Sequence, residues 1–101
     1  MTSPGDDWRT AETAPLLEAI VSLHTVDETA DFLRDLCTLR ELEEMTQRWA
    51  VVRLLSEGLS YREIANRTGA STATVTRINQ WLQHGTGGYH MMLERMAGTK
   101  S

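Results

Sequence analysis

The stretch LSYREIANRTGASTATVTRINQWL occupies residues 59–82 and predicts two short helices joined by a tight turn. Ser60 and Glu63 form a capping box, in which the serine side chain satisfies a free backbone N–H group at the start of the first helix. Gly69 follows the last turn of that helix, where a left-handed backbone conformation is needed and costs little without a Cβ. This order of helix, turn and helix is typical of a helix-turn-helix.

The second helix of this stretch has one apolar and one polar face. Ser71 or Thr72 caps it, and its apolar positions are Val75, Ile78 and Leu82. The opposite face carries small and polar side chains that can reach base edges and phosphates in the major groove, namely Thr72, Ala73, Thr76, Arg77 and Gln80. No acidic residue lies between residues 71 and 83. This favours DNA binding over the structural alternative, an ordinary helical hairpin in a bundle, whose solvated face usually carries both signs of charge.

Composition restricts the class of protein. The 101 residues suffice for one domain with a small core, and the rarity of proline (two residues) favours an all-α fold. The single cysteine, Cys37, cannot form an internal disulfide, which favours a reducing compartment. The sequence has neither the roughly 20 apolar residues of a membrane span nor the basic start of a signal peptide. We therefore expect a cytoplasmic protein without membrane contact.

Charge is distributed unevenly along the chain, whose net charge is −4. Residues 1–57 hold 12 Asp and Glu against 5 Arg, and residues 58–101 hold 5 Lys and Arg against 2 Glu. Positive charge thus collects in the half that contains the helix-turn-helix. Two explanations fit this asymmetry. The acidic half limits indiscriminate phosphate binding by a site-specific DNA-binding protein, or the acidic residues only keep a small helical protein in solution.

The apolar periodicity and the capping residues predict four further helices, at residues 14–24, 25–36, 38–57 and 89–96. Residues 1–13 are expected to form a flexible N-terminal tail, residues 14–97 the helical domain and residues 98–101 a C-terminal tail.

The first two of these helices are broadly apolar, which suggests burial against a second chain. A dimer with two-fold symmetry would also place two helix-turn-helix segments about one DNA turn apart, as recognition of a palindrome requires.

The motifs LSYREIA at 59–65 and ATVTR at 73–77 resemble the helix-turn-helix of the tryptophan repressor family. The pattern TGASTAT at 68–74 and the GGY sequence at 87–89 are similar to a branch of uncharacterised relatives, the YerC/YecD type. The resemblance spans about residues 14–93. It implies an all-α, TrpR-like helical domain that forms an intertwined homodimer and binds double-stranded DNA at a palindromic operator.

The resemblance also implies which residues contact DNA. The matching positions are Tyr61, Arg62, Thr72, Ala73, Thr74 and Thr76, to which the pattern of this helix-turn-helix adds Arg67, Ser71, Arg77 and Gln80. Ala65 stands where the repressor has a lysine, so one basic contact is missing, and Arg67 is expected to compensate from nearby.

A corepressor site is implied by the same resemblance, because Arg48 and Arg77 match the arginines that enclose tryptophan in the repressor. However, Ile78 replaces a glycine and Trp81 a serine there, and both changes add bulk to the slot. We therefore expect no cofactor, and we expect L-tryptophan to bind weakly or not at all, so that the protein represses without a ligand. Two alternatives stay open: a different small molecule with a carboxylate uses the two arginines, or Arg77 contacts a DNA phosphate.

Catalytic and metal-binding patterns are absent from the sequence. His24, His84 and His90 lack the paired spacing of metal ligands, and Gly85–Gly88 lacks the preceding strand and following lysine of a nucleotide loop. No nucleophile or general-base pair supports an enzyme.

The sequence therefore predicts a sequence-specific DNA-binding transcriptional regulator, expected to be a repressor, that acts as a homodimer. A repressor that depends on a carboxylate metabolite is one alternative. A protein-interaction module that does not bind DNA is another, supported by the acidic body and by Ala65.

Overall fold

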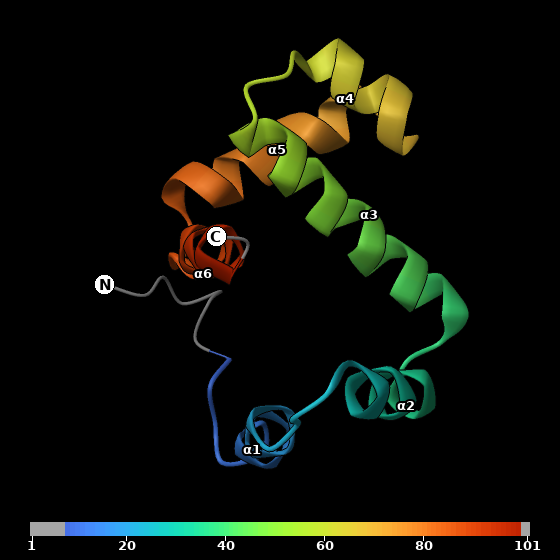
Figure 1. The fold of residues 1–101 in the computed structure, drawn as a ribbon, viewed down its shortest axis with the longest axis vertical. Helices are drawn as coiled ribbons and strands as arrows, with labels where there is room; N and C mark the ends of the chain where they lie inside the picture. The colour runs from blue at the N-terminus through green and yellow to red at the C-terminus, as the bar shows by residue number, and fades with distance from the viewer. Residues whose placement is uncertain (1–7, 100–101) are drawn as a thin grey trace. The chain divides into compact units, whose positions relative to one another are not determined.

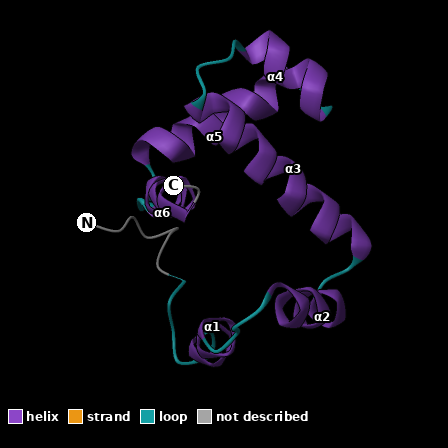
Figure 2. Cartoon of the chain, viewed as in Figure 1, coloured by secondary structure: helices purple, strands orange, loops and turns teal. Residues whose placement is uncertain are grey.

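The computed structural model describes residues 8–99, and these residues form six helices joined by loops (Figures 1 and 2). The helices are α1 (Ala14–Val21), α2 (Val26–Leu36), α3 (Leu39–Ser56), α4 (Tyr61–Thr68), α5 (Thr72–His84) and α6 (Gly88–Thr99). The predicted all-α fold is confirmed. Residues 1–7 of the predicted N-terminal tail and residues 100–101 of the predicted C-terminal tail lie outside the described residues.

Side-chain caps start three of the helices. The Thr25 hydroxyl accepts a hydrogen bond from the Glu28 backbone N–H at 3.0 Å and caps α2. Ser60 accepts from the Glu63 backbone at 3.2 Å. At the second helix of the helix-turn-helix the cap is Ser71, so that Thr72 becomes the first helical residue.

Two predicted helix ends differ from the structure by three residues each. The first helix ends at Val21 rather than residue 24, because the Ser22 hydroxyl donates to the Ala19 carbonyl at 2.7 Å and replaces the next helical bond. The last helix runs from Gly88 to Thr99 rather than from residue 89 to 96. It therefore crosses residue 97, where the sequence placed the end of the domain, and the domain limits themselves stay a prediction.

Contacts divide the chain into two compact units, one up to Leu39 and one from Arg40 onward. In the first unit, neither α1 nor α2 contains a buried residue. Val21 is 83% and Val26 84% exposed, and Leu36 is half exposed. These two helices thus present apolar surface that their own unit does not cover.

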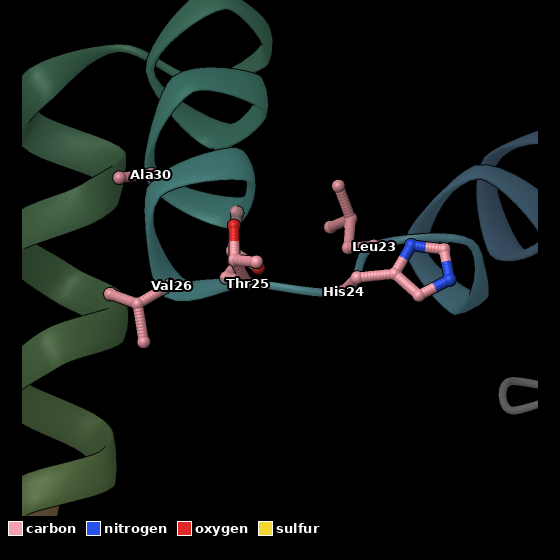
Figure 3. A pocket seen from close by; sticks show the side chains of 6 residues that line it. Leu23, His24, Thr25, Val26 and Ala30 are labelled. Atoms are coloured by element: carbon pink, nitrogen blue, oxygen red, sulfur yellow. The ribbon is translucent and has the colours of Figure 1, made fainter.

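An open, mainly apolar hollow lies at the junction of α1 and α2 in this unit. Its lining comes from the connecting loop and from the first turns of α2, as Figure 3 shows for Leu23, His24, Thr25, Val26 and Ala30. The His24 backbone N–H donates to the Glu28 carboxylate at 2.9 Å, which holds the loop against α2.

The second unit contains the core, which is aliphatic. It consists of Val51 and Val52 of α3, Ile64 of α4, Ala70 of the turn, and Val75, Ile78 and Leu82 of α5. The helix α6 joins this core through Leu93 and through Tyr89, whose ring lies 6.4 Å from that of Trp49 between centroids. The core therefore connects the helix-turn-helix to α3 and α6.

Candidate nucleic-acid interface

The two helices of the helix-turn-helix pack through fully buried side chains. Ile64 of α4 and Val75 of α5 are each 0% exposed, and Ile78 of α5 is 1% exposed. Ala70, in the turn between them, is also buried. Burial of about four apolar side chains supplies several kcal/mol toward a fixed crossing of α4 and α5. The polar face of α5 is therefore presented by a rigid pair of helices.

The turn between α4 and α5 is held from two sides. Gly69 has φ +79°, the left-handed conformation that the sequence predicted, and its N–H donates to the Ala65 carbonyl at 2.9 Å. The Gln47 amide of α3 donates to the Thr68 carbonyl at 3.2 Å. This bond from α3 satisfies a carbonyl at the open end of α4 and fixes the turn to the core unit.

The residues predicted to contact DNA lie almost entirely at the surface. Thr74 is half-buried, and the exposed ones are Tyr61, Arg62, Arg67, Ser71, Thr72, Ala73, Thr76, Arg77 and Gln80. They belong to α4, to its connection with α5, and to the first three turns of α5. Contact with DNA requires side chains that are exposed in this way. The individual roles of these residues stay a prediction.

Hydrogen bonds at the start of α5 orient several of these side chains. Thr74 receives bonds at its hydroxyl from Ser71 Oγ at 3.0 Å and from the Arg77 guanidinium at 3.3 Å. The Thr76 hydroxyl donates to the Thr72 carbonyl at 2.9 Å, so that its oxygen lone pairs and its methyl group remain available. Thr74 thus belongs to the cap of α5, and Arg77 lies along the helix surface beside it.

Arg67, which was expected to compensate for the missing lysine, is paired within its own helix. Its Nε lies 3.1 Å from a carboxylate oxygen of Glu63, and both side chains are at least half exposed. An exposed pair of this kind contributes only about 0–1 kcal/mol. Arg67 can therefore exchange Glu63 for a phosphate at little cost.

Two polar residues that connect the helices were missed by the sequence reasoning. Gln47 holds the turn, as described above, and the Asn79 amide of α5 donates to the Tyr61 hydroxyl of α4 at 2.8 Å. Both bonds join residues about 20 positions apart. Helical periodicity carries no signal for such pairs, because it relates only residues within one helix.

The residues matched to a corepressor site differ in their surroundings. Arg48 of α3 and Arg77 of α5 are both exposed. Ile78 lies in the core, in contact with the cluster that contains Val52 and Ile64. Trp81 is 53% exposed. The isoleucine thus occupies interior volume, as expected from its size, whereas the tryptophan ring lies largely at the surface.

Within residues 8–99, no group of three or more His, Cys, Asp and Glu side chains is arranged to hold a metal ion. No helix in the same range is long and apolar enough to cross a membrane.

Residues 11–97 match the sequence profile of the family described as Trp repressor protein. The chain belongs to the Trp repressor family. Membership of this non-enzymatic family agrees with a surface helix-turn-helix and with the lack of catalytic motifs noted in the sequence.

Relatives of this Trp repressor family member include proteins of known structure. The chain is 40% identical over 96 residues to the uncharacterized protein YerC of Bacillus subtilis strain 168, covering 95% of this chain and 92% of YerC. Its structure is similar to that of a TrpR-like protein from Eubacterium eligens ATCC 27750 (TM-score 0.84, 42% identity), over 88% of this chain and 92% of that one. It is also similar to a candidate Trp repressor from Staphylococcus aureus (TM-score 0.88, 35% identity), over 95% and 96% of the two chains. The TrpR-like fold is therefore confirmed.

Proposed function

We propose that this protein is a cytoplasmic, sequence-specific DNA-binding transcriptional repressor that acts as an intertwined homodimer on a palindromic operator. The observation that carries the proposal is the exposed polar face of α5. From residue 71 to residue 83 this helix and its cap contain no acidic side chain, in a chain whose net charge is −4. The chain as a whole is acidic, but this surface carries no negative charge. Such a surface suits a polyanionic ligand.

Arginine side chains on the helix-turn-helix support the same function. Arg62, Arg67 and Arg77 are exposed on α4 and α5, and their only acidic neighbour along these two helices is Glu63. Arginine binds phosphate through two parallel N–H bonds, and the hydroxyl and methyl groups of Thr72 and Thr76 suit contacts with base edges. The segment therefore combines the groups that position a protein on DNA with groups that read a sequence.

A dimer is proposed because α1 and α2 bury no residue of their own. Large apolar side chains such as Ile20, Val21 and Leu36 are exposed there, which is typical of a surface covered by a second chain. Two-fold symmetry would then present two helix-turn-helix segments to successive major grooves.

Independence from tryptophan is proposed because of Ile78. This side chain is 1% exposed, so the interior position beside α5 already contains an apolar group. Arg77, moreover, is hydrogen-bonded to Thr74 on its own helix. We therefore expect the same DNA affinity with and without L-tryptophan, and we keep the repressor that requires a carboxylate metabolite as the second candidate, supported by the exposure of Arg48.

Selection of bound sequences from a random duplex pool, at about physiological salt so that nonspecific phosphate contacts are screened, tests the proposal. We expect a palindrome with half-sites about one helical turn apart. The variant with Thr72→Asp and Thr76→Asp should lose binding, whereas Thr46→Asp, an exposed threonine on α3, should bind normally. Failure to enrich any sequence, with or without a metabolite extract, would instead support a protein-interaction module.

A further inference from the structure

The side chain of Asn79 joins the two helices of the helix-turn-helix at the surface. Its Nδ2 donates to the phenol oxygen of Tyr61 at 2.8 Å. Tyr61 is the first residue of α4, and Asn79 lies in the middle of α5. The buried core cluster does not include Tyr61, whose hydroxyl stays at the surface.

The direction of this hydrogen bond decides what the tyrosine hydroxyl can do. An amide nitrogen is a donor only, so the phenol oxygen acts as the acceptor and its own O–H proton is not used in the bond. At the other end of the amide, Asn79 Oδ1 accepts from Gln83 Nε2 at 3.5 Å, a long contact that agrees with this orientation. The donors therefore run in one direction, from Gln83 through Asn79 to Tyr61, which leaves the Tyr61 O–H available to donate to a group outside this helix pair.

The surroundings of Tyr61 favour an anionic acceptor for that O–H group. Its side chain is 37% exposed and stands at the N-terminal end of α4, where the helix dipole is positive. The next residue, Arg62, is exposed and carries a positive charge. Phosphate oxygens only accept hydrogen bonds, so they match an outward-directed donor beside an arginine.

We propose that Asn79 is a positioning residue that orients the Tyr61 hydroxyl as a hydrogen-bond donor to a phosphate of the DNA backbone. The proposal rests on the DNA-binding function proposed above. Because successive hydrogen bonds polarise one another, donation from Asn79 also strengthens the outward bond of the tyrosine. The contact fixes register on the duplex and carries no sequence information.

A double-mutant cycle on DNA affinity tests this proposal. The probe is a fluorescein-labelled duplex of random sequence at about 50 mM salt, where phosphate contacts dominate binding. Tyr61→Phe and Asn79→Ala should each weaken binding about tenfold, as expected for a hydrogen bond to a charged group. The double variant should bind no more weakly than either single one. Asn66→Ala, the other asparagine of the chain and an exposed residue of α4, serves as the matched control and should bind like the wild type.

Two further measurements separate positioning from a purely structural role. The salt dependence of binding should keep its slope in Tyr61→Phe, because no charge is removed, while the affinity falls. Asn79→Asp, which preserves size but only accepts hydrogen bonds, should draw the Tyr61 O–H inward and weaken binding more than Asn79→Ala. In nuclear magnetic resonance spectra of the free protein, Tyr61→Phe should shift the side-chain amide signal of Asn79 and leave that of Asn66 unchanged.

The outcomes distinguish this proposal from the function on which it rests. A wild-type protein that binds no duplex overturns both. Wild-type binding with unchanged affinity in Tyr61→Phe and Asn79→Ala, or with losses that add in the double variant, overturns the positioning role and leaves DNA binding intact.

Discussion

Replacement of Ile78 by alanine tests whether this side chain fills the interior beside α5. Ile78 is 1% exposed and belongs to a cluster that includes Val52, Ile64 and Val75. The substitution removes both γ-carbons and the δ-carbon, which are worth about 0.8 kcal/mol each when buried, and leaves a cavity whose walls relax only in part. We expect the free energy of unfolding to fall by about 3–4 kcal/mol, a large fraction of the roughly 5–15 kcal/mol that stabilises a typical domain.

The loss can be measured by circular dichroism during thermal unfolding. For a chain of this size a loss of 3 kcal/mol corresponds to a fall in Tm of about 12–24 °C. Wild type and variant must be compared at the same protein concentration, because association of chains would make Tm concentration-dependent. Gln80→Ala, an exposed position two residues further along α5, is the matched control and should change stability by less than about 0.5 kcal/mol. A loss below about 1 kcal/mol in Ile78→Ala would refute the reasoning, since removing three buried carbon atoms from a packed interior lowers the free energy of unfolding by more than that.

The same variant also tests the link between Ile78 and ligand independence. An apolar cavity in a protein interior stays dry and binds small apolar molecules. Indole should therefore raise the Tm of Ile78→Ala and leave the wild type unchanged. An equal effect of indole on both proteins would show that it binds elsewhere.

Four further predictions concern the turn, the charges and the apolar helices. Gly69→Ala should lower the free energy of unfolding by about 1–2 kcal/mol in denaturant titrations because of its positive φ, although the nearest atom to the new Cβ lies 3.9 Å away. Arg62→Ala should reduce the slope of log affinity against log salt by about 0.9 for each helix-turn-helix on DNA, as measured by fluorescence anisotropy. Glu63→Gln should release Arg67 and tighten duplex binding at low salt, and a weaker complex would mean that the ion pair itself orients the arginine. Val26→Asp, at a position 84% exposed, should turn a dimer into monomers in sedimentation velocity, whereas a dimer that persists would place the interface elsewhere.

The local features of the fold could be predicted from the sequence because each depends on a few neighbouring residues. Ser60 and Gly69 begin and end α4 as expected, since a cap or a left-handed turn needs one particular kind of side chain. The buried stripe of α5 follows helical periodicity and was predicted residue by residue. The prediction failed where weak local bonds compete, as at Ser22, whose hydroxyl ends α1 early.

The connections between helices could not be predicted in the same way. The amide of Gln47 reaches the turn, and that of Asn79 reaches Tyr61, only because α3, α4 and α5 cross at particular positions. A polar residue in a single sequence looks the same whether it faces water or a partner on another helix. The helical pattern and the family resemblance predict which surface residues are proposed to contact DNA. The hydrogen bonds that orient these residues depend on how the helices pack, and the sequence does not predict them.

The absence of buried residues in α1 and α2 has a consequence for the proposed repressor, because it concerns how much of the chain is dimeric. If a second chain covers these helices, the stability they gain is supplied by association and follows mass action. Dilution would then unfold the N-terminal unit before it affects the aliphatic core beneath the helix-turn-helix. Occupancy of two half-sites would rise with the square of the chain concentration when monomers dominate, so a modest change in expression would produce a sharper change in repression.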